Sequence, residues 1–110
     1  MAYTPVNYDN RRYMPEPLQQ FTTAVFEKAG MSAEHAAELG GYLVATDLRG
    51  VLSHGTGTAA GYAQSFKSAV YNPRPEISVT CEAGATIQYD GAGGVGHLCS
   101  ARAVRGAIDK

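Results

Sequence analysis

Several features that mark common protein classes are rare or absent in this sequence of 110 residues. It contains no tryptophan and only two cysteines, too few for the disulfide framework of a small secreted domain. No apolar run approaches the roughly 20 residues that span a bilayer, so we predict no membrane segment. No basic and then apolar leader opens the chain, which predicts a cytoplasmic protein.

Charge is also scarce, because only 17% of the residues are charged and the two signs nearly balance at a net charge of −1. A nucleic-acid partner would need a basic face to neutralise its phosphates, so we predict no nucleic-acid binding. By contrast, 45% of the residues are hydrophobic, which predicts a folded chain. A chain of this length forms one domain at most, with a core of modest size.

The two cysteines, Cys81 and Cys99, do not form a CxxC pair. His97 lies two residues before Cys99, but two ligands do not make a zinc site. We therefore predict free, buried thiols in a reducing cytosol and no metal site, with a bridge or a metal ligand as the alternative.

The first 16 residues show neither a helical nor a strand period, and Tyr13 is followed closely by Pro15 and Pro17. With Tyr3 and Tyr8, this segment predicts an irregular arm that lies on another surface, such as a second subunit.

Three segments with apolar residues at spacings of three and four predict helices over residues 17–29, 33–49 and 59–70. The adjacent Gly40 and Gly41 weaken the second helix unless a neighbour approaches its backbone closely.

Four residues are expected to begin or end these helices. Gly30 and Gly50 suit the left-handed residue that follows a helix, and Ser32 and Thr58 suit the caps of the second and third helices.

The period then changes from helix to strand. Alternating apolar residues predict short strands at 77–81 and 87–89, and Ser100 is expected to cap a last helix that reaches the chain end. Two short strands do not make a stable sheet by themselves, so we predict that this region is the beginning of a larger structural unit.

A glycine-rich loop lies between the second strand and the last helix. Gly91, Gly93 and Gly96 match G-x-G-x-x-G, a pattern that can bind a pyrophosphate at a helix N-terminus. The preceding strand is short and half polar, unlike a central parallel strand. We favour a turn with another purpose and keep a Rossmann loop as the alternative.

The segment that follows the second helix carries the residues best suited to chemistry. Arg49 suits the negative end of a helix but Asp47 does not, so Asp47 is expected to have a partner. Sequence neighbours rarely join their side chains, so we do not expect Ser53 and His54 to form a catalytic pair by themselves. In a polar turn, His54 could act as a general acid or base if a carboxylate from elsewhere oriented it.

Several stretches together resemble the malate/L-lactate dehydrogenase family, NAD(P)-dependent oxidoreductases outside the Rossmann class. In order they are DLRGVLSHG at 47–55, Tyr62, NPRP at 72–75, GAT at 84–86, and Asp90-Gly91 followed by GVG at 94–96. The resemblance covers about residues 15–110 and implies a longer enzyme, usually a homodimer, of which this chain is the N-terminal third.

The fold that the resemblance implies is an α+β fragment. An irregular arm at 1–16 precedes a three-helix N-terminal part at 17–75, and residues 76–110 begin a truncated, non-Rossmann α/β domain that binds the cofactor. NAD or NADP would find its main contacts beyond Lys110, so no cofactor-binding residue is assigned within this chain.

The same resemblance implies a catalytic role for Ser53 and His54, with His54 donating a proton and a downstream Asp joining the relay. The substrate would be a small 2-hydroxy or 2-oxo acid. At Thr58 the family often has an Arg that grips the substrate carboxylate, and His97 stands where Gln is frequent.

Two other functions remain open. One is a catalytically inactive remnant that acts as a dimerisation or interaction module, and the other is a stand-alone Rossmann-type nucleotide binder.

Overall fold

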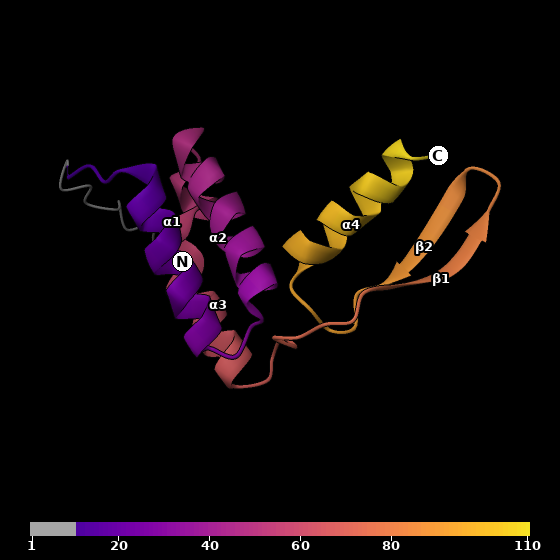
Figure 1. Cartoon of the computed structure of the whole chain (residues 1–110), viewed down its shortest axis with the longest axis horizontal. Helices are drawn as coiled ribbons and strands as arrows, with labels where there is room; N and C mark the ends of the chain where they lie inside the picture. The colour runs from indigo at the N-terminus through magenta and orange to yellow at the C-terminus, as the bar shows by residue number, and fades with distance from the viewer. Residues whose placement is uncertain (1–10) are drawn as a thin grey trace, which may run out of the picture.

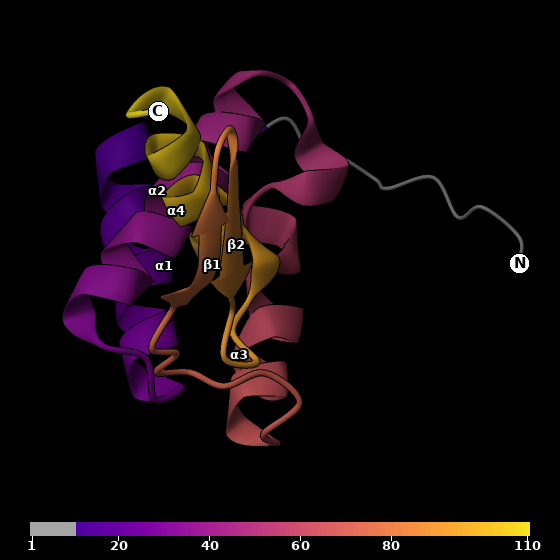
Figure 2. The same ribbon diagram turned by 90° about the vertical axis from the view of Figure 1, so that its right-hand side faces the viewer.

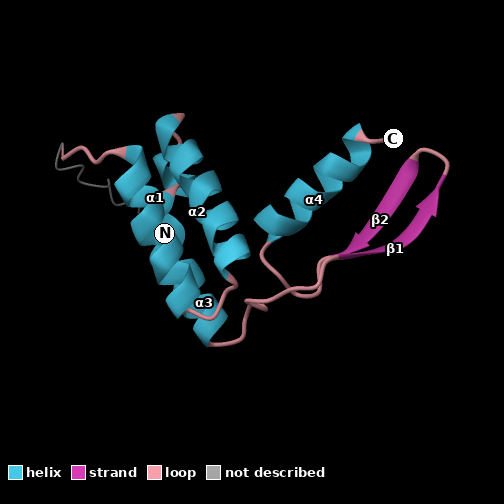
Figure 3. Ribbon diagram, in the orientation of Figure 1, coloured by secondary structure: helices cyan, strands magenta, loops and turns pink. Residues whose placement is uncertain are grey.

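The computed structural model describes residues 11–110, which form an α+β structure, as the sequence predicts. In chain order the elements are α1 (Pro15–Lys28), α2 (Ala33–Leu48), η1 (Leu52–His54), η2 (Thr56–Thr58), α3 (Ala59–Lys67), β1 (Ser78–Ala83), β2 (Thr86–Asp90) and α4 (Gly96–Ile108). Helices α1, α2 and α3 pack together, and the two strands form a ribbon beside α4 (Figure 1, Figure 3). None of the helices in this described part is long and apolar enough to cross a bilayer.

Helix α1 begins two residues earlier than the sequence predicts. Pro15 and Pro17 stand in its first turn, where proline is tolerated because the first N–H groups have no partner within the helix. The predicted arm is therefore wrong at residues 15 and 16. Tyr3 and Tyr8 of that arm lie outside the described residues.

The ends of α1 and α2 follow the predicted capping pattern. Gly30 has φ +111° and Gly50 has φ +79°, values that favour glycine. The Ser32 hydroxyl accepts a hydrogen bond from the His35 N–H at 3.2 Å, so its predicted cap is confirmed.

Gly40 marks the close contact between α1 and α2. A Cβ added at Gly40 would lie 2.9 Å from the Thr23 hydroxyl oxygen and 3.4 Å from the Thr23 nitrogen. The predicted close approach of a neighbour is therefore confirmed, and it accounts for a glycine inside the helix.

The third helix begins at Ala59, as predicted, but it ends earlier and lacks the predicted side-chain cap. Two single-turn 3-10 helices, η1 and η2, precede it, and α3 ends at Lys67 instead of residue 70. Ala69 turns the chain away with φ +58°. Thr58 stands at the N-cap, but its hydroxyl donates to the Gly55 carbonyl at 2.7 Å, so the predicted side-chain cap is wrong.

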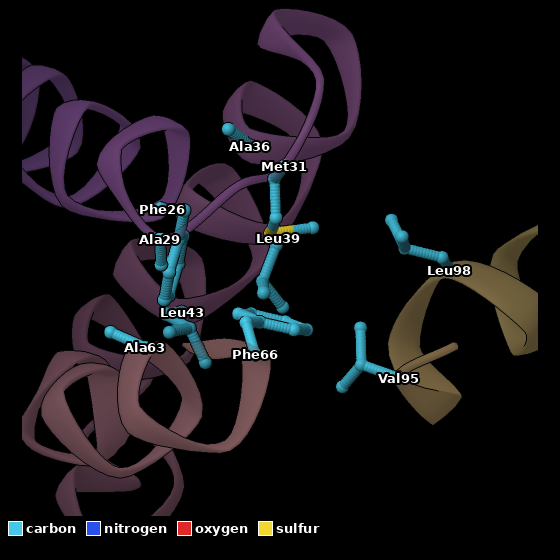
Figure 4. Packing of buried hydrophobic residues seen from close by; sticks show 10 residues of the cluster. All are labelled: Phe26, Ala29, Met31, Ala36, Leu39, Leu43, Ala63, Phe66, Val95 and Leu98. Carbon is cyan, nitrogen blue, oxygen red and sulfur yellow. The ribbon is translucent and has the colours of Figure 1, made fainter. Parts of the chain in front are cut away.

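The core lies among the three N-terminal helices and extends to the start of α4 (Figure 4). The Phe26 and Phe66 rings meet edge to face with centroids 6.0 Å apart. Val95 and Leu98 are 2% and 3% exposed and join α4 to this core. The buried hydrophobic set is Phe26, Ala29, Met31, Ala36, Leu39, Leu43, Ala63, Phe66, Val95 and Leu98.

The strands form an antiparallel ribbon with a bulge between Val79 and Cys81. Figure 1 shows α4 between this ribbon and α2, and Figure 2 shows the same molecule from the side of the ribbon. Every residue of β1 is exposed. The predicted burial of Cys81 is therefore wrong, because within the described residues nothing covers β1, whereas Cys99 on α4 is half-buried. Neither thiol is in a disulfide.

The glycine-rich loop packs against the segment that leaves α3. The Asn72 N–H donates to the Gly93 carbonyl at 2.8 Å, and the Asn72 amide donates to the Ala92 carbonyl at 3.0 Å. A Cβ at Gly94 would lie 2.6 Å from Pro75, so this glycine is explained by packing inside the protein. The prediction of a turn with another purpose is confirmed, and the antiparallel ribbon contradicts the Rossmann alternative.

Helix α4 begins at Gly96, four residues before the predicted cap at Ser100. Val95 occupies the N-cap position with no side-chain hydrogen bond, so the prediction for Ser100 is wrong. Burial of Val95 and Leu98 fixes the start of the helix instead, because both side chains are drawn into the core.

Candidate active-site turn

The segment between α2 and α3 carries the candidate catalytic residues. Helix α2 ends in a Schellman arrangement, in which the Gly50 N–H donates to the Asp47 carbonyl at 2.8 Å and the Val51 N–H donates to the Thr46 carbonyl at 3.2 Å. The chain then forms η1 and η2, with Gly55 between them. We call residues 47–58 the active-site turn.

Asp47 has the partner that the sequence requires. Its carboxylate oxygen Oδ2 accepts the backbone N–H of Thr56 at 3.0 Å and also the Thr56 hydroxyl. These charge-assisted hydrogen bonds explain an acidic residue near the unfavourable end of a helix. The prediction that Asp47 has a partner is therefore confirmed, whereas the sequence does not single out Thr56 as that partner.

Gly55 is needed for space. Any residue could adopt its backbone conformation, with φ −94°, but the position is buried. A Cβ added there would overlap the Asp47 carboxylate. The sequence places Gly55 in the motif but does not reveal this role, because the contact depends on the path of the turn.

Ser53 and His54 form a direct pair within η1. The Ser53 hydroxyl lies 2.8 Å from His54 Nδ1, and both residues are exposed. The expectation that neighbouring side chains would not join is therefore wrong. In the tight 3-10 turn the two side chains project close enough to bond.

This hydrogen bond fixes which ring nitrogen is left available. A neutral imidazole can accept from Ser53 at Nδ1 with its proton on Nε2, or donate Nδ1–H to Ser53 with Nε2 unprotonated; in an imidazolium, both nitrogens carry protons and Nδ1 donates to Ser53. In each state Nε2 is free to exchange a proton with a substrate oxygen, because within residues 11–110 the ring has no other hydrogen bond.

Thr58 lies beside a small pocket of about 430 Å³ that it shares with Gly57, Gly61, Tyr62, Ser65 and Tyr71. None of these residues carries a positive charge, and the Thr58 hydroxyl is already bonded to the Gly55 carbonyl. The described side chains therefore place no cation here that could grip a carboxylate.

A larger groove of about 920 Å³ runs between α2 and α4. Its lining includes Arg49, Tyr62, Tyr71, His97 and Ser100, but neither Ser53 nor His54. The His97 ring meets the edge of Tyr62 with centroids 5.6 Å apart, and burial lowers the pKa of His97. The protonated ring is thus disfavoured there.

A polar bridge joins α2 and α4 beside this groove, whose lining includes Tyr42 and Arg105. Arg105 forms an ion pair with Glu38 at 2.9 Å, and the Tyr42 hydroxyl donates to the same Glu38 oxygen at 2.7 Å. Burial alone would raise the pKa of Glu38, but the hydrogen bonds from Tyr42 and Arg105 and the charge of Arg105 lower it below its ordinary value.

The glycine-rich loop is not shaped to cradle a dinucleotide, because it is packed against Asn72 and Pro75 and its strand belongs to an antiparallel ribbon. Among the residues that the structure describes, no group of three or more His, Cys, Asp or Glu side chains could hold a metal ion.

Comparison with known proteins identifies the family. The family model described as malate/L-lactate dehydrogenase matches residues 14–110. The helical layer that carries the SHG turn, the ribbon and α4 thus correspond to a segment of that family's chain. The chain belongs to the malate/L-lactate dehydrogenase family.

Individual relatives agree with this assignment. The chain is 33% identical over 96 residues to the L-sulfolactate dehydrogenase of Methanocaldococcus jannaschii. The alignment covers 87% of this chain and 28% of that protein. It is 33% identical over 109 residues to the malate dehydrogenase of Pyrococcus horikoshii, covering 99% of this chain and 30% of that protein.

Solved structures show the same fold. The malate dehydrogenase structure from Pyrococcus horikoshii matches with a TM-score of 0.85 at 32% identity, covering 99% of this chain and 31% of that one. The malate dehydrogenase from Entamoeba histolytica matches with a TM-score of 0.84 at 28% identity, covering 90% and 28%. The chain thus spans less than a third of the length of these relatives.

Proposed function

We propose that this chain supplies the acid–base pair of an NAD(P)-dependent dehydrogenase that interconverts 2-hydroxy and 2-oxo acids. The hydrogen bond between Ser53 and His54 in the active-site turn carries the proposal. Family membership supports it, as do the names of the relatives, which are sulfolactate, hydroxycarboxylate and malate dehydrogenases.

In this proposal, His54 is the general acid for reduction. A bound nicotinamide would supply a hydride to the carbonyl carbon, and the imidazolium of His54 would give its Nε2 proton to the carbonyl oxygen. The ring is left neutral, with its remaining proton on Nδ1 and bonded to Ser53. Ser53 thus holds the ring orientation in both protonation states, and in oxidation of the alcohol the same proton returns to Nε2.

The substrate carboxylate is not held by Thr58 in this proposal. A neutral threonine lacks the guanidinium fork that binds a carboxylate through two hydrogen bonds. Thr58 would instead shape the small pocket beside Tyr62 and leave the carboxylate to another residue.

We also propose that the helical part at 17–75 is followed at residue 76 by the beginning of a non-Rossmann α/β cofactor domain. The ribbon and α4 lie together on one side of the helical layer, which supports this division (Figure 1). As the family resemblance implies, the complete enzyme would work as a cytoplasmic homodimer.

A chimera tests the proposal directly. This chain replaces the matching segment of the Pyrococcus horikoshii malate dehydrogenase, to which it is 33% identical over 109 residues. The chimera should reduce 2-oxo acids with NADH or NADPH, and His54→Ala should lower kcat by about 10²–10⁴-fold with cofactor affinity unchanged.

Lys67→Ala, at an exposed position at the end of α3, is the control and should leave turnover unchanged. A folded chimera that binds cofactor but turns over no 2-oxo acid would favour the alternative of an inactive interaction module. Full turnover in His54→Ala would mean that the acid lies elsewhere.

A further inference from the structure

We infer that Asp47 is a positioning residue, which clamps the active-site turn so that Ser53 and His54 are presented as a pair. The inference rests on the proposed function for its catalytic consequence, but its structural content stands on the contacts of Asp47 alone.

Asp47 bonds both the beginning and the end of the turn. Its backbone carbonyl accepts the Gly50 N–H at 2.8 Å, which sets the direction in which the chain leaves α2. Its carboxylate accepts the Thr56 N–H at 3.0 Å and the Thr56 hydroxyl. One residue thus closes the loop that contains η1.

The turn has little else to hold it. Val51, Leu52, Ser53 and His54 are all exposed. Within the described residues, the side chains of Ser53 and His54 bond only each other. The His54 N–H donates to the Val51 carbonyl at 3.1 Å, which is a bond inside the turn. Apart from the Val51 N–H bond to the Thr46 carbonyl, the bonds at Asp47 are therefore what hold the pair in position relative to α2 and α3.

The surroundings of the carboxylate are shaped for this contact. Gly55 is buried against it, and any side chain at that position would overlap Asp47. No ion pair involves Asp47 among residues 11–110, so its charge is satisfied by the N–H and O–H donors of Thr56. A carboxylate near a helix C-terminus is electrostatically disfavoured, so an Asp at this position needs a compensating role, which its bonds to Thr56 supply.

The kinetic test uses the chimera described above. Asp47→Ala should lower kcat by about 10²-fold, the effect of a small misplacement of a reacting group, with the dissociation constant of NAD(P)H unchanged. Asp47→Asn keeps an acceptor oxygen and should recover most of the lost kcat. Thr56→Val keeps the backbone donor and should lose about 2–10-fold, the worth of one hydrogen bond, while Thr56→Ser should match the parent.

Asp90→Ala is the matched control. The Asp90 carboxylate also accepts a backbone N–H, that of Ala92 at 2.8 Å, but it lies in the glycine-rich loop. Asp90→Ala should therefore disturb a loop of similar kind without changing kcat. Equal losses of kcat in Asp90→Ala and Asp47→Ala would overturn the inference.

The structural test uses the 110-residue chain and needs no activity. In Asp47→Ala, the Thr56 amide should exchange with solvent faster, and the ¹⁵N shifts of the His54 ring should move to those of a free imidazole. Unchanged His54 shifts would overturn the inference. Should Asp47→Ala fail to fold, the comparison of Thr56→Val with Thr56→Ser decides by the same two signals.

The two tests separate the inference from the proposed function. Loss of the His54 signature without loss of kcat would uphold the clamp and refute the catalytic role of the pair. Loss of kcat with an unchanged His54 signature would uphold a functional turn and refute the clamp.

Discussion

Replacing Leu98 with alanine should weaken the attachment of α4 to the helical layer. Leu98 is 3% exposed and reaches from α4 into the core that Phe26, Leu39 and Phe66 build (Figure 4). The other apolar residues of α4 that lie nearer its end are exposed, Val104 at 57% and Ile108 at 77%. Within the described chain, Leu98 and Val95 therefore provide the apolar anchor of this helix.

The size of the effect follows from that burial. A leucine that becomes alanine in a core loses about 2–5 kcal/mol of stability, through lost transfer free energy and the cavity left behind. Leu98 stands at the edge of the core, where neighbours can partly close the gap, so we expect about 2–3 kcal/mol. For a chain of this size, such a loss lowers Tm by about 10 °C.

Circular dichroism at 222 nm, in thermal and urea unfolding, measures this change without a tryptophan. Val104→Ala removes methyl groups from an exposed position on the same helix and should change stability by less than about 0.5 kcal/mol. Equal effects of the two substitutions, or no loss in Leu98→Ala, would refute the reasoning that α4 is anchored through Leu98.

Three further outcomes are expected. Thr58→Arg in the chimera should tighten a 2-oxo acid by about 1–3 kcal/mol, visible as a lower KM, because it adds a charge-assisted hydrogen bond. The 110-residue chain alone should show no NADH oxidation with any 2-oxo acid, because its glycine-rich loop is packed against Asn72 and Pro75 and leaves no space for a pyrophosphate. The lowered pKa of Glu38 means that its stabilising effect is present above pH 4.5 and is lost as pH falls below it. The urea midpoint of Glu38→Gln should therefore fall less than that of the parent between pH 7 and pH 3.

The regular elements could be predicted because their signals are local. Alternation placed the strands, spacings of three and four placed the helices, and Gly30, Ser32 and Gly50 act through their own backbone or nearest neighbours. The start of α4 was missed because tertiary burial of Val95 and Leu98 outweighs the capping preference of Ser100. The burial of Cys81 was misjudged because alternation gives the face of a strand but not whether that face is covered.

The candidate site shows the same division. Motif resemblance indicated Ser53 and His54, and the poor electrostatic position of Asp47 required a partner for it. Neither signal revealed that Thr56 is this partner or that Ser53 bonds its own neighbour. Both contacts depend on two consecutive 3-10 turns, which leave little trace in residue spacing.

The hydrogen bonds that shape the active-site turn join residues that are close in the sequence, so Leu98→Ala should leave them intact. The hydrogen bonds described for residues 49–58 all run within residues 45–59, from the Arg49 N–H on the Ala45 carbonyl to the Ala59 N–H on the Thr56 carbonyl. Loosening α4 removes none of them. In folded Leu98→Ala, the Thr56 amide should therefore remain as protected as in the parent, relative to global unfolding, and the His54 ring ¹⁵N shifts should be unchanged. A change in either signal would mean that the turn depends on α4 and not on Asp47 alone.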